Sequence, residues 1–518
     1  MRMILSFLLT LNVFAFAQDS LYCVNTLVGD SVNKIIFAKG AGDINGDGYD
    51  DLVVSFSDSV KIYLGNDRFE LKPAYSYGNN NGFVLCPGDV NGDGYADLLI
   101  GEKRFETGTH GHISNINLFF GSEDGMDTCK TFGYEVSLWD QIFSKNVEPI
   151  GDVNGDGFTD FAISSPYNWG NGISYVYLYL GGDSISSEPF ATFTNYMTEH
   201  SLGTFGESVC GIRDVNADGF DDILIGDPGY DDTLYAESSG AVYLFYGGAE
   251  MDSVADSILT GNKEDNFGYD IDNLGDINGN GHQEFAISEL GYVYFYEFPN
   301  GIFRIYDYLN IGGGGDINND GYNDFLLGNI QYINENGVMV GGAFLFYGSA
   351  EQDTIFDSKL EGETQWSDFS RELDIFGDFN KDEYDDFYIL APLYPDDQNE
   401  KGKLYLYSYK KINGIKDTKN TVMNTFRLFP GYPNPFNSRT IIPYYLKTTS
   451  AIKAEIYDIG GRLIKSLYSG QKPAGRHQLA WNGKTNSGSA AASGIYLIVI
   501  KQGKNNTNIL SNKIVLIK

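Results

Sequence analysis

Cysteine and histidine are scarce in this sequence, which limits the metal and redox chemistry that it can support. The 518 residues include five histidines, and only His110 and His112 lie close together. A histidine pair of this kind in a loop is more often a solvated turn than a metal site. No arrangement of Ser, His and Asp typical of a nucleophilic enzyme is present. The four cysteines are Cys23, Cys86, Cys129 and Cys210. In an exported chain they allow three disulfide connectivities, and otherwise they serve as small buried residues within strands.

Basic residues are half as frequent as acidic ones, 35 against 70, which gives a net charge of −35. The deficit of basic residues is uneven along the chain. Residues 18–410 hold 18 Lys and Arg against 67 Asp and Glu, whereas residues 426–518 hold 13 against two. The strongly acidic part argues against nucleic acid as a partner. The opposite charge of the two segments indicates two domains, and the polar residues 411–425 between them read as a linker.

Long hydrophobic runs are missing beyond the N-terminus. Residues 1–17 combine an early arginine, a short apolar stretch and small residues before Gln18, as secretory signal peptides do. No other segment approaches about twenty apolar residues, so we expect no transmembrane segment. We expect residues 1–17 to be a signal peptide and the remainder to be exported.

The sequence does contain a nine-residue motif that occurs seven times. The first copy, Asp43-Ile-Asn-Gly-Asp-Gly-Tyr-Asp-Asp51, carries oxygen-bearing side chains at positions one, three, five and nine. Calcium takes about six to eight oxygen ligands, and such a loop supplies them from alternate side chains and the carbonyl of its seventh residue. An EF-hand has a similar opening but closes with a glutamate between two helices. Neither feature is present, so we predict calcium loops between strands.

We call the copies loops 1 to 7, and each contributes five predicted calcium ligands. These are Asp43, Asn45, Asp47, Tyr49 and Asp51 in loop 1; Asp89, Asn91, Asp93, Tyr95 and Asp97 in loop 2; Asp152, Asn154, Asp156, Phe158 and Asp160 in loop 3; Asp214, Asn216, Asp218, Phe220 and Asp222 in loop 4; Asp276, Asn278, Asn280, His282 and Glu284 in loop 5; Asp316, Asn318, Asp320, Tyr322 and Asp324 in loop 6; and Asp378, Asn380, Asp382, Tyr384 and Asp386 in loop 7.

Five of these loops keep every ligand type, and two depart from the pattern. In loop 5, Asn280 replaces an acid and Glu284 replaces the last aspartate, which lowers the charge and lengthens one arm. In loop 7, Glu383 occupies a position where the turn needs a left-handed backbone that favours glycine. We expect five strong calcium sites and regard loops 5 and 7 as doubtful.

The segments around the loops predict an all-β fold. Each repeat of about 40 to 60 residues reads as four strands without helical periodicity, as in the blades of a β-propeller. The last repeat supplies only three strands, while residues 21–27 form a strand-like run with no repeat of their own. We predict that this run completes the seventh blade and closes the ring.

The repeats resemble the FG-GAP repeats of the integrin alpha-chain propeller. Phe205-Gly206 and Phe267-Gly268 match the FG element, and Gly226-Asp227-Pro228 matches the GAP element. The resemblance covers residues 21–410 and implies a seven-bladed propeller over residues 18–410.

The C-terminal segment, residues 426–518, resembles the C-terminal sorting domain of type IX secretion cargo in Bacteroidetes-like bacteria. The resemblance rests on the order of YPNPFN, a Gly-Gly-Arg turn, WNG, SGIY and a terminal strand that bears lysine. It implies a small Ig-like β-sandwich that the type IX machinery reads. The protein would then be secreted or held on the surface of a Gram-negative cell.

Three functions remain open at this stage. The first is a binding module for a surface protein or a glycan, with aromatic residues opposite the calcium loops as candidate contacts. These are Tyr167, Trp169, Tyr230, Trp366 and Tyr394. The second is a carbohydrate-active enzyme, a polysaccharide lyase or hydrolase on a calcium propeller. The third is a purely structural surface protein. We favour the first, because no catalytic constellation is visible.

Overall fold

The structure is a computed structural model in which every regular element of the described residues is a β-strand. It describes residues 20–516 except 79–82, 106–111, 124, 137–146, 166–172, 197–203, 232–237, 263–264, 298–299, 351–353, 396–399, 411–426, 429–435, 437–438, 447, 459–460, 474 and 504–507. The predicted signal peptide and linker lie outside the described residues. The chain divides into two compact units, Met1–Asn413 and Gly414–Lys518. In the described part, no helix is long and apolar enough to cross a membrane.

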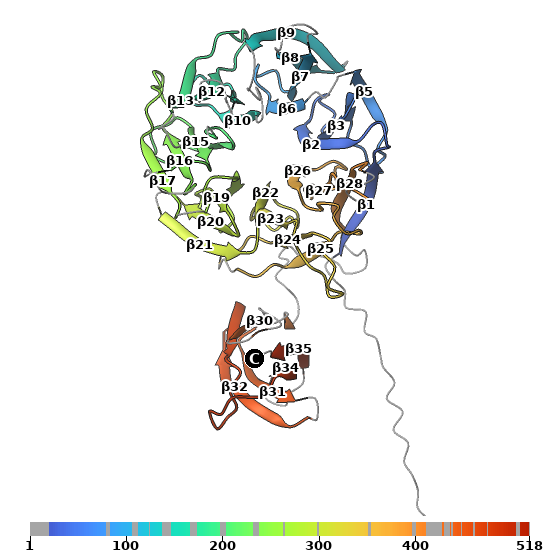
Figure 1. Cartoon of the computed structure of the whole chain (residues 1–518), viewed down its shortest axis with the longest axis vertical. Coiled ribbons are helices and arrows are strands. Elements are labelled where there is room, and N and C mark those ends of the chain that lie inside the picture. The colour runs from blue at the N-terminus through green and yellow to red at the C-terminus, as the bar shows by residue number, and fades with distance from the viewer. Residues whose placement is uncertain are drawn as a thin grey trace, which may run out of the picture. The chain divides into compact units, whose positions relative to one another are not determined.

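The first unit is a β-propeller, and its described residues form seven four-stranded antiparallel sheets arranged as a ring (Figure 1). The first four blades are blade 1 with β2 (Ile35–Gly42), β3 (Asp51–Phe56), β4 (Ser59–Tyr63) and β5 (Pro73–Gly78); blade 2 with β6 (Phe83–Gly88), β7 (Asp97–Phe105), β8 (His112–Ser122) and β9 (Gly125–Val136); blade 3 with β10 (Val147–Gly151), β11 (Asp160–Ser165), β12 (Ile173–Tyr179) and β13 (Ala191–Tyr196); and blade 4 with β14 (Val209–Ile212), β15 (Asp222–Asp227), β16 (Ala241–Phe245) and β17 (Ser257–Thr260).

The ring continues through three more blades. These are blade 5 with β18 (Ile271–Gly275), β19 (Glu284–Glu289), β20 (Tyr292–Glu297) and β21 (Asn300–Tyr306); blade 6 with β22 (Asn310–Gly315), β23 (Asp324–Asn329), β24 (Gly342–Phe346) and β25 (Ser358–Glu361); and blade 7 with β26 (Glu372–Gly377), β27 (Asp386–Ala391), β28 (Lys403–Lys410) and β1 (Ser20–Val28). In each blade the strand that precedes the acidic loop lies nearest the centre of the ring, as β2 does in blade 1 and β26 does in blade 7 (Figure 1).

The N-terminal strand closes the ring, as we predicted. β1 pairs antiparallel with β28, from Ser20 opposite Lys410 to Val28 opposite Lys403, with one irregularity after Cys23. The outer edge of β28 is therefore paired with a segment from the other end of the propeller. Since an unpaired strand edge invites association with other chains, this pairing both joins the ends and covers a vulnerable edge.

Burial follows from the position of each strand in its blade. The second strands are buried along their whole length, as in β3 and β15. Their sequences are accordingly near-continuous apolar runs, because neighbouring blades cover both faces. The outermost strands alternate instead between partly buried and exposed residues, as β17 does. The core thus lies between blades, as shown by a cluster that joins Leu52 of blade 1 to Leu404 of blade 7.

The FG elements are structural contacts within a blade and between neighbouring blades. Phe205 is 2% exposed, and its ring meets that of Tyr243 edge-on at 5.3 Å between centroids. The following Gly206 has a φ of 83°. A Cβ there would lie 2.8 Å from a methyl group of Val176 in blade 3, so only glycine fits without a shift.

The second unit is a small β-sandwich of Ig-like type. Its strands are β29 (Arg427–Leu428), β30 (Thr440–Leu446), β31 (Ser450–Asp458), β32 (Leu463–Lys472), β33 (Gly475–Trp481), β34 (Gly494–Gln502) and β35 (Asn508–Leu516). They form one sheet in the order β29-β30-β33 and another in the order β32-β31-β34-β35. The fully buried Trp481 packs against Phe436 and Tyr496 in its core.

The cysteines whose side chains are described are not paired. Cys86 and Cys210 are buried free thiols, and Cys23 is an exposed one. The side chain of Cys129 lies outside the described part. Cys86 and Cys210 therefore act as small buried residues, the second of the two alternatives that the sequence left open.

Candidate functional site

Each acidic loop joins the first strand of its blade to the second. Loop 1 runs between β2 and β3, and loop 7 runs between β26 and β27. Because the blades repeat one strand order around the ring, the seven loops emerge on the same side of the propeller. We call this side the loop face.

The first aspartate of each loop organises the loop backbone. In loop 1, Asp43 Oδ1 accepts hydrogen bonds from the N–H groups of Gly46 at 2.7 Å and Asp47 at 3.1 Å, and Oδ2 accepts one from Gly48 at 2.7 Å. In every other loop the fifth and sixth residues donate to the first in the same way. The seven loops thus share one conformation.

The ninth residue of each loop brings a carboxylate into the core. Asp51 is fully buried, and its two oxygens accept the N–H groups of Ile44 at 3.0 Å and Gly65 at 2.8 Å. Burial raises the pKa of Asp51 to about 7, against the effect of these bonds, and nearby acids raise it further. A buried carboxylate of this kind gains stabilisation from a bound cation.

The loop residues fit calcium in type and order. The predicted side-chain ligands, at positions one, three, five and nine, all carry oxygen donors, as calcium prefers, and the seventh residue offers its backbone carbonyl. In loop 6 the Oδ1 atom of Asn318 is buried and has no hydrogen-bond partner among the described residues, so it is available to a cation. Among the described residues, no group of three His, Cys, Asp or Glu side chains gathers closely enough to hold a metal ion. The loop carboxylates instead hydrogen-bond to backbone amides, as Asp43 does.

Loop 5 differs from the others in its side-chain contacts. Glu284 Oε2 accepts the N–H of Ile277 at 2.9 Å, as the ninth aspartate does elsewhere. Its longer arm brings Oε1 into a short contact with Asn278 Nδ2, while Asn280 donates to Glu297 at 3.0 Å. In loop 5 the amide of Asn278 thus contacts the ninth residue, whereas in loop 1 the amide of Asn45 donates to the fifth residue, Asp47.

Loop 7 is doubtful as a calcium site because Glu383 stands where the turn favours glycine. The structure retains the turn, with Glu383 at a φ of 71°. The equivalent Gly48 in loop 1 has a φ of 81°. The hydrogen bonds of Asp378 hold this backbone in place. Glu383 therefore leaves the loop geometry intact and adds backbone strain.

Neighbouring loops hold one another through their eighth residues, which our sequence reasoning missed. Asp50 of loop 1 donates its N–H to the carbonyl of Asp378 in loop 7 at 3.1 Å, and its Oδ2 accepts the Asp378 N–H at 2.8 Å. The same two-way contact links Asp221 to Asp152. It also links Asn323 to Asp276 and Asp385 to Asp316. The recurrence of Asp or Asn at position eight was the available signal.

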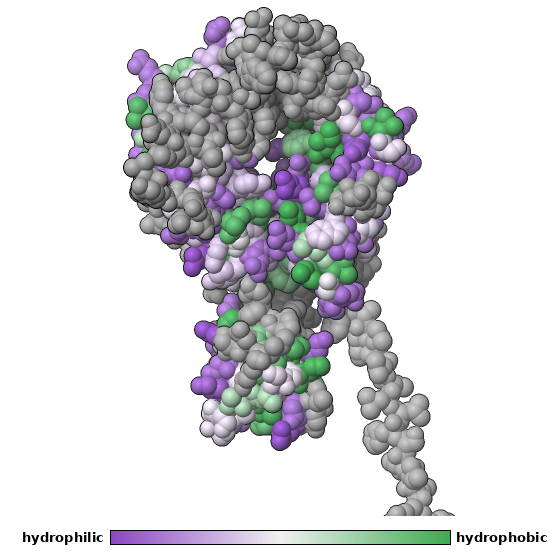
Figure 2. Space-filling model, in the orientation of Figure 1, coloured by the Kyte–Doolittle hydropathy of each residue, from purple (hydrophilic) through white to green (hydrophobic). Residues whose placement is uncertain are grey.

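A cavity of about 770 Å³ lies at the centre of the ring. In the space-filling view the ring is hollowed near its middle, with hydrophilic residues beside the opening (Figure 2). Six acidic side chains line the cavity, namely Glu148, Glu207, Asp270, Asp272, Glu372 and Asp374. The basic side chains that line it are Lys39, Arg213 and Arg371. These residues are far apart in the sequence, and only the closed ring brings them together.

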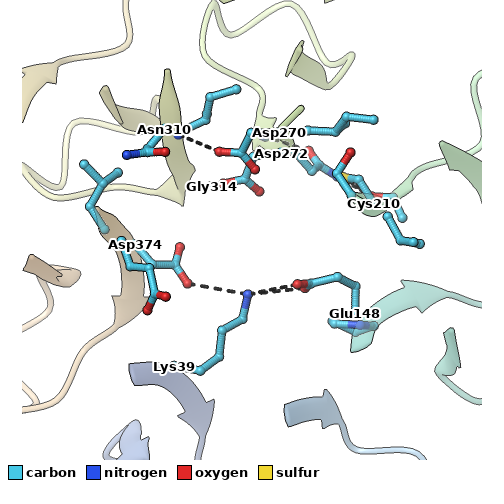
Figure 3. Close-up of a pocket in the computed structure, with 18 of the residues that line it drawn as sticks. Lys39, Glu148, Cys210, Asp270, Asp272, Asn310, Gly314 and Asp374 are labelled. Carbon is cyan, nitrogen blue, oxygen red and sulfur yellow. Dashed lines mark hydrogen bonds and ion pairs between the residues drawn. The ribbon is translucent and has the colours of Figure 1, made fainter. Parts of the chain in front are cut away.

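Lys39 occupies one side of this cavity (Figure 3). Its Nζ lies 3.3 Å from both carboxylate oxygens of Glu148 and 3.9 Å from Asp374 Oδ2. Burial opposes the positive charge, but Glu148 and Asp374 outweigh it and hold the pKa of Lys39 well above its usual range. Lys39 is therefore an ammonium, which rules it out as a neutral amine nucleophile near pH 7.

The predicted binding aromatics are placed unevenly. Tyr167 and Trp169 lie outside the described residues. Tyr230 and Tyr394 are partly buried, and Lys403 lies 4.9 Å from the ring centre of Tyr394. Trp366 is 51% exposed and has a φ of 61° in the segment between β25 and β26. Trp366 is the candidate contact that the structure presents to solvent.

Known families match parts of this chain. FG-GAP repeats match residues 149–179 and 205–245, an FG-GAP-like repeat matches residues 43–100, and the FlgD Ig-like domain matches residues 439–506. Integrin alpha-5 of Xenopus laevis is 33% identical over 152 residues, which is 29% of this chain and 14% of that protein. Integrin alpha-V of Gallus gallus is 26% identical over 213 residues, 38% of this chain and 20% of that protein.

The chain thus spans a fifth or less of the length of these relatives. A solved structure described as BBS1N in complex with ARL6DN aligns over 75% of this chain and all of that one, with 10% identity and a TM-score of 0.42, a likeness too low to bear on function. The FG-GAP repeats resemble those of integrin alpha chains, and this similarity suggests an adhesion or binding propeller.

Proposed function

We propose that this protein is an exported binding propeller that takes up calcium in its loops and binds a surface protein or a glycan on the opposite side. The observation that carries the proposal is the closed ring of seven loops with one shared conformation and a recurring set of oxygen donors. Calcium bound there would neutralise the loop carboxylates and stiffen the loop face through the contacts between neighbouring loops. A ring stiffened in this way is a rigid scaffold for the loops of the opposite side, where we place recognition.

Trp366 is the residue through which we propose that the partner is bound. A large exposed aromatic ring contributes contact area at little cost in conformational entropy, and it stacks equally well on a sugar or on a protein side chain. Its backbone is held at a positive φ, together with those of Asp368 and Ser370 in the same segment. Positions of this kind are often functional.

Binding of the purified full-length protein to arrays of glycans and of surface proteins tests this proposal. The wild type should bind in calcium, and Trp366→Ala should lose most of that binding without a change in melting temperature. Tyr306→Ala is the matched control, since Tyr306 is 47% exposed on the outer strand of blade 5. Equal binding by wild type and Trp366→Ala would exclude the surface around Trp366 as the partner-binding site. Turnover of a polysaccharide would favour the alternative of a carbohydrate-active enzyme.

We also propose that the C-terminal sandwich directs type IX secretion. Its similarity to the FlgD Ig-like domain and its basic charge beside an acidic propeller support a separate role. In a host with type IX secretion, the full-length protein should reach the cell surface or medium. A form lacking residues 426–518 should accumulate in the periplasm, and its efficient appearance outside the cell would contradict the assignment.

A further inference from the structure

The central cavity has no role in calcium binding or in the proposed partner contact. None of the predicted loop ligands lines it, and Trp366 is not among its lining residues. Lys39 points toward Glu148 and Asp374, and Asp270 and Asp272 lie across the cavity from Lys39 (Figure 3). The side chains of Lys39, Glu148 and Asp374 are only 27%, 28% and 20% exposed, and shielding charges from water is costly unless they are paired, so the arrangement needs its own explanation.

Equivalent positions on four of the inner strands bring an excess of negative charge to the cavity. Lys39, Glu148, Asp272 and Asp374 each lie four residues before the first aspartate of their loop, so they occupy equivalent positions on β2, β10, β18 and β26. All four line the cavity. Three carboxylates therefore face a single ammonium group, and Lys39 is within ion-pair distance of only Glu148 and Asp374 among them.

Other carboxylates of the cavity offer further acceptors. Asp270 accepts the N–H of Ile311 at 2.9 Å, and Asp272 accepts the N–H of Gly313 at 3.1 Å, which fixes both carboxylates in place. One oxygen of Glu372, Oε2, is buried and has no hydrogen-bond partner in the described part of the chain. A buried acceptor of this kind is open to a donor supplied by a ligand.

We propose that the central cavity binds a small organic cation that bears ammonium or guanidinium groups. Its volume lies within the range of about 300 to 1,000 Å³ that is usual for small-molecule sites. The carboxylates are spread around the wall rather than gathered, and no described cluster is compact enough for a metal ion, which favours an extended cation. Phe37, Tyr269 and Tyr388 add aromatic surface for its methylene groups or charge.

Lys39 shows how such a group is held and also competes with it. Its ammonium rests between Glu148 and Asp374 in the way that a bound amine would. A ligand with two positive groups would place one of them against Asp270 and Asp272 on the side of blade 5. Removal of the Lys39 charge frees two more carboxylates, so it should strengthen binding.

Proton release should accompany this binding. Burial raises the pKa of Asp374 to about 6 and that of Glu372 to about 8, and it holds the pKa of Asp272 well above its usual range. The other charged groups that face them are Lys39, Arg371, Glu148 and Asp270. A cation stabilises the ionised form of these carboxyls, so they give up protons when it binds.

Calorimetric titration of the full-length protein in saturating calcium tests the proposal. Cadaverine, agmatine and a blocked Gly-Lys-Gly peptide are the probes, in two buffers that differ in ionisation enthalpy. We expect one ligand per chain and proton release near pH 7. Binding of the free amines alone identifies a soluble ligand, and binding of the peptide alone identifies a basic side chain of a partner.

Three variants distinguish binding in the cavity from general electrostatic attraction of the cation to the acidic protein. Asp272→Asn with Asp374→Asn should weaken binding at least tenfold. Asp67→Asn with Glu70→Gln, at side chains that are 74% and 66% exposed, makes the same change in charge and should have no effect. Lys39→Met should tighten binding about tenfold, a gain that mere loss of structure would not produce. Absence of saturable binding, equal losses in both double variants, or weaker binding by Lys39→Met would overturn the proposal.

Discussion

Replacement of Glu383 by glycine should stabilise the propeller, because Glu383 holds a φ of 71° that glycine adopts freely. A non-glycine residue in this region costs roughly 1 to 2 kcal/mol. Fixing the backbone of glycine when the chain folds costs about 0.5 to 1 kcal/mol more in conformational entropy than fixing that of other residues. The net gain is therefore about 0.5 to 1 kcal/mol. The hydrogen bond from Asn319 to the carbonyl of residue 383 uses only the backbone and is retained.

This gain corresponds to a small but measurable change in melting temperature. With an unfolding entropy of about 2.1 cal/mol/K per residue, a propeller of roughly 390 residues has about 0.8 kcal/mol/K in total. The expected rise is about 1 °C. Scanning calorimetry in saturating calcium, with replicate scans at one rate, resolves a shift of this size.

Two matched variants make the test selective. Ala217 occupies the fourth position of loop 4 at a φ of 60°, so Ala217→Gly should also raise the melting temperature. Gly157 has a φ of 91° at the position of loop 3 equivalent to Glu383, and a Cβ there would have no atom within 4 Å. Gly157→Ala should lower the melting temperature by a comparable amount, because its effect is purely conformational. A lower melting temperature for Glu383→Gly, with Gly157→Ala unchanged, would refute the assignment of backbone strain.

Three further predictions concern stability. Removal of residues 20–28 should lower the melting temperature and promote aggregation, because it exposes the edge of β28. Light scattering during a thermal scan measures both effects. Unchanged behaviour would mean that β1 does not close the ring. Phe205→Ala should destabilise the propeller by about 3 to 5 kcal/mol in equilibrium unfolding, because it removes a buried ring from a hydrophobic core cluster. Glu372 has a folded pKa of about 8, raised by burial, so the folded state binds more protons and this group lowers stability as pH rises from about 4.5 to 8. Glu372→Gln should therefore match the wild type near pH 4.5 and exceed its melting temperature at pH 8.

The fold was predictable because its signals are local and repeated. The apolar runs of the second strands, such as β3, and the fixed loop motif identified the blades, and a missing strand in blade 7 indicated where β1 belongs. The turn at Glu383 was not predictable from residue type. Its conformation is set by hydrogen bonds to Asp378, which outweigh the preference for glycine.

The cavity was beyond the reach of sequence reasoning for a different physical reason. Lys39, Glu148 and Asp374 lie on three different blades, and their ion pairs exist only when the ring closes. Nothing in the local sequence distinguishes them from solvated charges on a strand. Their shared position four residues before each loop can be counted in the sequence, but only the closed ring shows that this position faces a common cavity.

Calcium is the premise on which the proposed function depends, and one experiment addresses it directly. Melting of the full-length protein is measured in saturating calcium and again in excess chelator, with bound calcium counted by elemental analysis. We predict five to seven bound ions, one fewer for Asp152→Ala, and a marked fall in melting temperature without calcium. Each site filled at a hundredfold excess over its Kd adds about 2.7 kcal/mol. An unchanged melting curve in excess chelator, with no calcium bound beforehand, would contradict the account.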